Sequence, residues 1–344
     1  MTARAGYGAT RPSGPGPAGA AVPPSGTVAT AVLVTYNSAR HIAAALTPLL
    51  RAGLAVRVVD NASQDGTVAL LAREFPDVEV TANRRNVGFA AAVNQALAGC
   101  ESEVVLLVNP DCVLPVGAAW ALLGYLDGHP EVGVVGPRLV DAAGRVAISA
   151  HPFENLTSVL LSRFGGSLVP VPLRRLVSGG RRRSAYDACR APSGPVSVDW
   201  LSGACLAVRR SLLTEVGGLD ENYFMYYEDE ELCLQVHRRG ADVVLLPAVS
   251  ATHTGGGSSA DPNWIWPHLY RSMLHFFARH RRSTYQAVRL AVLLRALLGI
   301  GLAAVRLTVS PRSGTARARA WYSVARTAAT ATSTAPERQP ACTS

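Results

Sequence analysis

Short apolar runs alternate with amphipathic segments along the chain from residue 29 onward. Runs rich in valine and leucine predict strands at residues 29–35, 56–61, 78–82, 103–109 and 132–137. The segments between them predict helices at residues 38–53, 65–75, 87–100 and 115–129. Because continuous runs of valine and leucine alternate with helices, both faces of the sheet must be covered. The pattern therefore predicts an α/β fold with a mostly parallel sheet and helices on both faces.

After residue 138 this alternation ends. Residues 139–149 predict a hairpin around Gly144, and residues 151–195 are irregular and rich in arginine. Regular elements resume with strands expected at residues 196–210 and 241–247 and helices at residues 228–240 and 266–280. We therefore expect one domain over residues 29–285, with residues 151–195 as a basic variable insert.

The two ends of the chain differ from this domain. Residues 1–28 are rich in Pro, Gly and Ala and contain no apolar core, which predicts a disordered tail and not a signal peptide. Near the other end, three arginines interrupt the apolar stretch 287–309, so its longest uncharged run is too short to span about 30 Å of hydrocarbon. Two interpretations are open: an amphipathic helix in a membrane interface, or a helix of the core. We expect residues 286–310 to form the interfacial helix and residues 311–344 a flexible tail.

Composition and charge narrow the function classes. The hydrophobic fraction of 49% is enough for a large core, and the formal charge is +9 without a single lysine. Codon bias in a GC-rich genome accounts for the missing lysine, while arginine suits diphosphates and anionic lipid headgroups. The arginines lack aromatic interleaving, so we expect no nucleic-acid partner. Six cysteines without a CxxC pair are typical of reduced thiols in the cytoplasm.

Polar side chains follow the ends of four successive predicted strands. They are Thr35, Tyr36 and Asn37 after the first strand, Asp60 after the second, Asn86 after the third, and Asn109 and Asp111 after the fourth. Because open α/β sheets bind ligands at the carboxyl ends of their strands, these residues predict a polar crevice. The glycine fingerprint of a dinucleotide site is absent there, which argues against a dehydrogenase. Taken singly, Asp60 can instead cap a helix, and Asn-Pro-Asp is also ordinary turn chemistry.

Several blocks identify the chain as similar to a known family. The blocks, in order, are "VLVTYNSARHI", "VVDNASQDGT", "NRRNVGFAAAVNQAL", "LLVNPDC", "DWLSGACLAVRRSLLTEVGGLDENYFMYYEDEELCLQVHRRG" and "THTGGGSS". They resemble family 2 glycosyltransferases with the GT-A (Rossmann-like) fold over roughly residues 29–280, and within that family bacterial rhamnosyltransferases. The resemblance implies an inverting transfer of a sugar from a nucleoside diphosphate to an acceptor hydroxyl.

The resemblance also implies a metal site. Asn109 and Asp111 match the family's DxD position, where carboxylate oxygens and a divalent ion hold the donor diphosphate. Asn109 replaces the first acid, which puts the strictness of the metal requirement in doubt. His253 matches the family's late metal-ligand histidine, although a lone histidine is more often structural. Hard oxygen ligands fit Mg²⁺ or Mn²⁺.

Family correspondence puts the catalytic base on Asp229, with Glu228 beside it, because the acceptor hydroxyl must lose its proton as it attacks. These acids can also simply favour the dipole at the start of a helix. Trp200 and Gly203 resemble the segment that borders the donor sugar, although a buried tryptophan is a comparable interpretation of Trp200. The tyrosines and Phe224 at positions 223–227 are expected to lie in the core.

The resemblance further implies substrates and location. We expect dTDP-rhamnose as donor, with UDP-galactose, UDP-N-acetylglucosamine and GDP-mannose as alternatives, and a lipid-linked saccharide of cell-wall or polysaccharide assembly as acceptor. The basic insert and the interfacial helix predict a peripheral enzyme on the cytoplasmic, anionic face of the membrane. Two other classes stay open: a sugar nucleotidyltransferase, which normally begins with a glycine- and lysine-rich segment absent here, and an inactive nucleotide-sugar-binding protein.

Overall fold

A computed structural model describes residues 28–163, 187–190, 194–255, 261–308 and 310–332. The tail at residues 1–27, most of the expected basic insert and the last glycine-rich residues after His253 lie outside these ranges. The arginines at positions 174, 175 and 181–183 are therefore not part of the description that follows.

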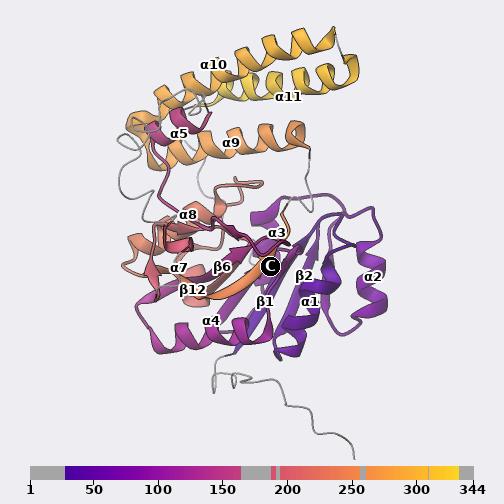
Figure 1. The fold of residues 1–344 in the computed structure, drawn as a ribbon, viewed down its shortest axis with the longest axis vertical. Helices are drawn as coiled ribbons and strands as arrows, with labels where there is room; N and C mark the ends of the chain where they lie inside the picture. Colours follow the sequence, from indigo (N-terminus) through magenta and orange to yellow (C-terminus); the bar gives the residue numbers. More distant parts are fainter. Residues whose placement is uncertain (1–27, 164–186, 191–193, 256–260, 309, 333–344) are drawn as a thin grey trace, which may run out of the picture.

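The core of the fold is a ten-stranded sheet (Figure 1). Its strands are β1 (Ala29–Thr35), β2 (Ala55–Asp60), β3 (Glu79–Ala82), β4 (Val104–Val108), β5 (Cys112–Val113), β6 (Val132–Val140), β7 (Val146–Ala147), β9 (Val196–Ser197), β11 (Cys205–Arg209) and β12 (Asp242–His253). The main path runs β3-β2-β1-β4-β11-β6-β12-β5. Strands β3, β2, β1 and β4 are parallel, as is the pair β6–β12, whereas β11 is antiparallel to both of its neighbours. A separate small sheet pairs β8 (Ala150–His151) with β10 (Trp200–Leu201). The predicted α/β sheet is confirmed, but it is mixed: four of its strand pairs are parallel and five, most of them only two residues long, are antiparallel.

Helices cover both faces of the sheet. The first face buries side chains of α1 (Ile42–Arg51), α2 (Thr67–Glu74) and α4 (Val116–Gly128) against the strands. The second face does the same with α3 (Phe89–Leu97), α7 (Arg210–Val216) and α8 (Glu228–Arg238). Alternate residues of β1 and β4 belong to the two clusters, as the period of two in a strand requires. The five described cysteines are buried and free.

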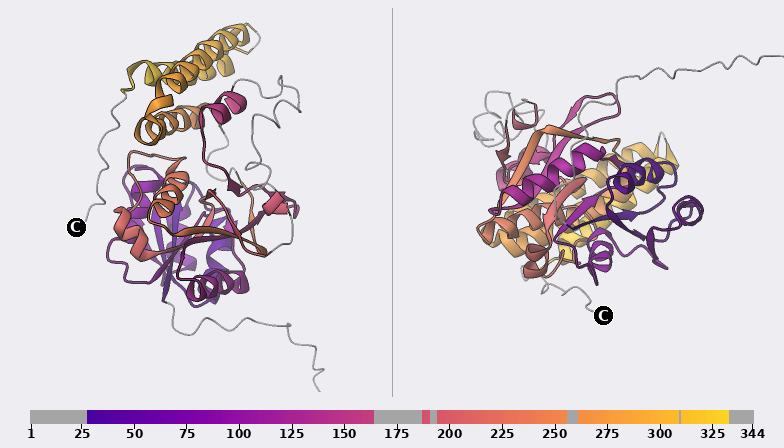
Figure 2. Two further views of the ribbon diagram at one scale, coloured as in Figure 1. Left: turned by 90° about the vertical axis from the view of Figure 1, so that its left-hand side faces the viewer. Right: turned by 90° about the horizontal axis from the view of Figure 1, so that it is seen from below.

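A third layer of helices lies over the second face of the sheet (Figures 1 and 2). It contains α5 (Leu156–Arg163), α9 (Pro262–His280), α10 (Arg282–Leu307) and α11 (Pro311–Thr330). Its own core joins aromatic residues of α9 and Tyr285 and Trp321 to Tyr223 and Tyr227, which precede α8. The layer is therefore fixed to the segment that carries the predicted catalytic acids.

The flexible tail predicted from residue 311 is wrong for residues 311–330, because these form α11 and pack against α10 and α9. Trp321 lies against Gly299, where a larger residue would leave no room, and Arg295 stacks on the Trp321 ring at 4.5 Å. Arg289 donates hydrogen bonds of 2.7 and 2.8 Å to carbonyls at the end of α11. Taken whole, with its arginines included, α10 is long and apolar enough to cross a membrane, whereas its uncharged runs are not.

Candidate active site

A cleft of about 330 Å³ opens at the carboxyl ends of β1, β2 and β4, where the strand-end residues were expected to meet. Its lining comes from the first strands, from the start of α3, from the segment before β11 and from residues 224–229. The side chains most relevant to chemistry are Tyr36, Asn61, Asn86, Asn109, Asp111, Phe224, Tyr226, Glu228, Asp229, His253 and Trp264.

The Asn-Pro-Asp segment is a turn and also faces the cleft. The backbone N–H of Cys112 donates to the carbonyl of Asn109 at 2.9 Å, which closes the turn. Strand β5 then pairs with the end of β12, opposite His253. This pairing sets the imidazole Nε2 of His253 3.2 Å from Oδ1 of Asp111. The segment is therefore a turn whose Asn109 and Asp111 line the cleft.

The charge of the cleft fits a divalent cation. Asp111, Glu228 and Asp229 are three carboxyl groups among the lining residues, and His253 is the basic side chain beside them. The described residues contain no cluster of three His, Cys, Asp or Glu side chains that encloses a metal. A cation held by Asp111, Asn109 and His253 would therefore complete its shell with substrate phosphates and water, which is the ordinary mode of Mg²⁺ binding.

The acids at the start of α8 are held by an unusual backbone. Tyr226 and Tyr227 have φ angles of 68° and 72°, a left-handed conformation that is unfavourable for residues with a side chain. Such strain persists only where the surroundings fix it and is concentrated at functional sites. Here it turns the chain so that Glu228 and Asp229 open the helix and line the cleft, while the ring of Tyr227 is buried in the third layer.

Asp229 is oriented by two backbone donors. Its Oδ2 accepts from the N–H of Gly203 and its Oδ1 from the N–H of Glu230, both at 2.9 Å. Burial raises the pKa of the Asp229 carboxyl, against the opposing effect of these hydrogen bonds. Burial and the charge of Asp229 raise the pKa of Glu228 well above its ordinary value, and its Oε2 has no partner among the described residues. A carboxylate with a raised pKa is suited to accept a proton.

Three predicted strand-end residues support the cleft from behind and do not line it. Asp60 is buried and accepts hydrogen bonds of 2.8 Å from Thr35 Oγ1 and from the N–H of Ser63. Asn37, with a φ of 52°, accepts from the N–H of Gln64 at 2.8 Å. In this structure these side chains fix the loops after β1 and β2, and a direct contact with the donor stays a prediction.

Two predicted sugar-bordering residues have different places. Gly203 lines the cleft and donates to Asp229. Trp200 is not among the lining residues: its ring stacks on His151 and its Nε1–H donates to the carbonyl of Pro152 at 3.0 Å. Trp200 is half-buried and packs against the core of the second face, so a structural role accounts for its position.

Sequence reasoning missed the aromatic wall of the cleft. Phe224 and Tyr226, expected in the core, line the cleft, whereas Tyr223 and Tyr227 are buried as expected. Trp264 at the start of α9 lies across from Phe224, and the ring of His268 stacks on Phe224 at 4.4 Å. Phe224 is held against the start of α3, because its carbonyl oxygen accepts a hydrogen bond of 2.7 Å from the N–H of Phe89. The approach is close enough that a Cβ at Gly88 would collide with the same oxygen. Asn61, which donates to the carbonyl of Gly88 at 3.1 Å, was also missed.

Comparisons with known proteins identify the family of the chain. The model of glycosyl transferase family 2 matches residues 30–178. The N-acetylglucosaminyl-diphospho-decaprenol L-rhamnosyltransferase of Mycobacterium tuberculosis is 31% identical over 268 residues, which cover 74% of this chain and 81% of that protein. Rhamnosyltransferase WbbL of Escherichia coli is 43% identical over 56 residues, covering 16% of this chain and 21% of that protein. The solved mannosyltransferase PcManGT from Pyrobaculum calidifontis, in complex with GDP-Man and Mn²⁺, covers 90% of each chain at 19% identity, with a TM-score of 0.49.

The chain belongs to glycosyl transferase family 2 and has the GT-A fold. It is a hexosyltransferase, as its ordered sequence blocks predicted.

Proposed function

We propose that the chain transfers rhamnose, with inversion, from dTDP-rhamnose to a hydroxyl of a saccharide carried on a lipid diphosphate in cell-wall or polysaccharide assembly. The transferred sugar and the acceptor class rest on the 31% identical relative, an N-acetylglucosaminyl-diphospho-decaprenol L-rhamnosyltransferase. The choice of dTDP as the nucleotide rests on the family resemblance of the sequence blocks alone. The observation that carries the chemistry is one cleft containing both the Asp111–His253 pair and the half-buried acid Asp229.

In the proposed step the acceptor oxygen attacks the anomeric carbon of the donor while its proton passes to Asp229. The bond from that carbon to the diphosphate oxygen breaks, and the nucleoside diphosphate leaves with the electron pair. Attack from the side opposite the leaving group inverts the anomeric centre. The N–H groups of Gly203 and Glu230 hold the Asp229 carboxylate in orientation for this transfer.

The leaving diphosphate would lie at the Asn-Pro-Asp turn. Asp111, Asn109 and His253 would hold Mg²⁺ or Mn²⁺ there, and such an ion supplies positive charge for the leaving diphosphate. Tyr36, Asn61 and Asn86 line the same cleft and offer hydrogen-bonding groups to the nucleotide. Trp264 and Phe224 form the apolar wall for a sugar ring.

The third layer supports a peripheral position on the cytoplasmic face of the membrane. Six apolar residues of α10 are each more than half exposed: Leu290, Leu294, Leu297, Leu298, Leu302 and Val305. We call this set the leucine stripe, because its three- and four-residue spacing puts it on one helix face. Helices α10 and α11 each carry four arginines and no acidic residue. An apolar face flanked by arginines fits the interface of an anionic bilayer.

Thermal stabilisation by a panel of nucleotide sugars, each with and without Mn²⁺, tests the donor without needing an acceptor. We expect dTDP-rhamnose to stabilise the chain more strongly with metal, and this effect to disappear in Asp111→Ala. If only UDP- or GDP-sugars stabilised the chain, the donor would be one of these and not dTDP-rhamnose. No shift with any nucleotide would overturn the donor site.

A further inference from the structure

A second cavity, of about 460 Å³, lies within the third layer between α9, the start of α10 and the end of α11. Its lining is Asn222, Arg271, Leu274, His275, Ala278, Tyr285, Ser323, Arg326, Thr327, Thr330, Ala331 and Thr332. These residues include two arginines and no aspartate or glutamate. We call this cavity the arginine pocket.

The arginines approach the pocket from different helices, Arg271 from α9 and Arg326 from α11. Neither forms an ion pair with any described residue. The hydroxyl of Tyr285, a residue only 1% exposed, has no hydrogen-bond partner among the residues that the structure describes. Two guanidinium groups on facing helices present forked N–H donors, the geometry that binds phosphate oxygens in pairs.

The positive charge of Arg271 affects the pKa of the nearby His268. Burial lowers the pKa of His268, one turn before Arg271, and the positive charge of Arg271 lowers it further. His275 is different, because it is already bound to Asp220 at 3.0 Å. The two arginines are therefore the groups in the pocket whose charge is left for a ligand.

One face of α9 connects the arginine pocket to the active-site cleft. Trp264 lines the cleft, His268 stacks on Phe224 of the cleft wall, and Arg271 and His275 line the pocket. Their spacing of three and four residues puts all four on one side of the helix. The seven residues from Trp264 to Arg271 rise about 10 Å along the axis, which is the scale of a monosaccharide joined to a diphosphate. Tyr285, which lines the pocket, lies in the first turns of α10, the helix that carries the leucine stripe from Leu290 onward.

We infer that the arginine pocket binds the diphosphate of the lipid-linked acceptor, with Arg271 and Arg326 as its ligands. This inference rests on the proposed function and makes it more specific. The order cleft, arginine pocket and leucine stripe matches the order saccharide, diphosphate and lipid in such an acceptor. The pocket would then hold the acceptor at a fixed distance from Asp229 and select against saccharides that carry no diphosphate.

The kinetic test compares two acceptors with the same saccharide, one on a prenyl diphosphate and one an alkyl glycoside without phosphate. We expect the double variant Arg271→Gln/Arg326→Gln to lower kcat/KM at least about tenfold for the diphosphate acceptor, mainly through KM. The kcat/KM for the alkyl glycoside and the KM of the donor should not change. Arg319→Gln is the matched control, since Arg319 is an exposed arginine of α11 outside the pocket lining. Equal losses with both acceptors, or no loss, would overturn the inference.

A binding test separates this inference from the proposed function. Geranyl diphosphate is titrated into the full chain with the nucleotide site filled by a nucleoside diphosphate and Mn²⁺. We expect binding that the double variant loses and Arg319→Gln keeps, even if no acceptor is turned over. Equal binding by all three proteins would overturn the pocket. If the double variant instead lost binding to phosphatidylglycerol vesicles and kept its binding of geranyl diphosphate, the pocket would belong to the headgroups of the bilayer. The inference would then fail.

Discussion

The imidazole Nε2 of His253 lies 3.2 Å from the carboxylate Oδ1 of Asp111, although the two residues are far apart in the sequence. The contact exists because β5, directly after the Asn-Pro-Asp turn, pairs with the end of β12. A neutral imidazole and a carboxylate at this distance can share a cation.

From this geometry we expect Asp111→Ala and His253→Ala each to weaken metal-dependent binding of a nucleoside diphosphate by about tenfold or more. The measurement is a titration of the nucleotide at fixed Mn²⁺, followed by thermal unfolding. His129→Ala is the control, because its ring stacks on Tyr125 and it does not line the cleft. If His253→Ala bound the nucleotide as the unmodified chain does, His253 would be a structural partner of Asp111 only.

The second prediction concerns the catalytic base. Asp229→Asn keeps an oxygen that can accept from the N–H of Gly203 but cannot take a proton, so we expect kcat to fall about a thousandfold while donor binding stays. Glu228→Gln should cost less, because the backbone donors hold Asp229. If kcat fell more in Glu228→Gln than in Asp229→Asn, Glu228 would be the catalytic base and Asp229 its neighbour.

The raised pKa of Asp229 gives a pH dependence with a definite sign. A base acts in its deprotonated form, so kcat/KM should fall as the pH drops through the pKa of this group. Because burial raises that pKa, the fall should begin above the ordinary aspartate value of 3.8. The pKa of the adjacent Glu228 is also raised, so the pH profile reports the combined titration of the two carboxyl groups. A kcat/KM profile that is flat down to pH 4 would contradict the assignment.

Much of the site followed from the sequence for a geometric reason. Parallel strands end at the same edge of a sheet, so residues after β1 and β4, such as Tyr36 and Asp111, had to meet there. The same rule could not tell lining residues from supporting ones. Asp60 carries a suitable carboxylate, but Thr35 and Ser63 occupy its oxygens, and this depends on loop conformation.

The aromatic wall and the last helix depend on packing between distant segments. Phe224 and Tyr223 are adjacent aromatics, and their local sequence does not show that Phe224 lines the cleft while Tyr223 is buried. Helix α11 has few large apolar residues, so its sequence resembles a tail. It becomes a helix of the fold because Trp321 and its small neighbours pack against α10, a partner that local sequence does not reveal.

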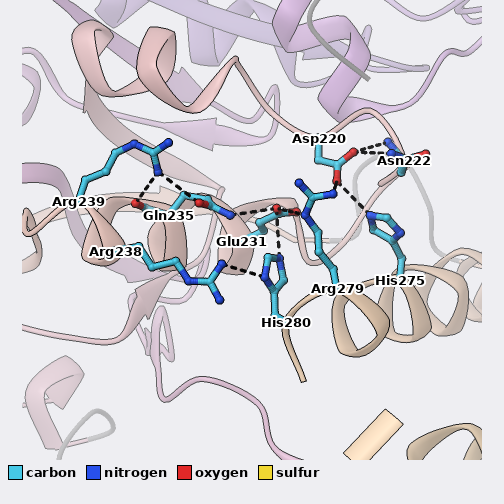
Figure 3. Close-up of polar contacts among 9 residues, drawn as sticks. All are labelled: Asp220, Asn222, Glu231, Gln235, Arg238, Arg239, His275, Arg279 and His280. Carbon is cyan, nitrogen blue, oxygen red and sulfur yellow. Dashed lines mark hydrogen bonds and ion pairs between the residues drawn. The ribbon is translucent and has the colours of Figure 1, made fainter. Parts of the chain in front are cut away.

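The third prediction concerns a buried charge network that joins α8 to α9 (Figure 3). Asp220 accepts from His275 at 3.0 Å, Glu231 lies 3.2 Å from His280, and Arg279 lies 3.7 and 3.4 Å from the two carboxylates. Removing Arg279 leaves two buried acids less compensated, so Arg279→Gln should lower the free energy of unfolding by about 3 kcal/mol. In the control Arg73→Gln, which breaks the exposed pair with Glu74, the loss should be below about 1 kcal/mol.

The network also fixes a pH dependence of stability. Burial raises the pKa of Asp220 and Glu231, but hydrogen bonds from His275 and His280 outweigh it, and both pKa values are lowered from the ordinary 3.8 and 4.5. A lowered pKa stabilises the fold above the unfolded value, and this contribution is lost as the pH falls through the folded value. Urea unfolding at pH 7 and pH 3.5 should therefore show a smaller effect of Arg279→Gln at the lower pH. An equal effect at both values would mean that Arg279 acts through packing.

The fourth prediction concerns the leucine stripe on α10. Replacing Leu294, Leu298 and Leu302 by glutamine removes apolar surface that is exposed in the isolated protein, so the fold should keep its thermal stability. Partitioning onto phosphatidylglycerol vesicles should fall at least about tenfold, because three buried leucine side chains would be lost from the interface. Leu50→Gln, an exposed leucine of α1, is the matched control. If binding vanished in high salt but survived the leucine replacements, the arginines alone would hold the protein at the surface, and the stripe would have no part in membrane binding.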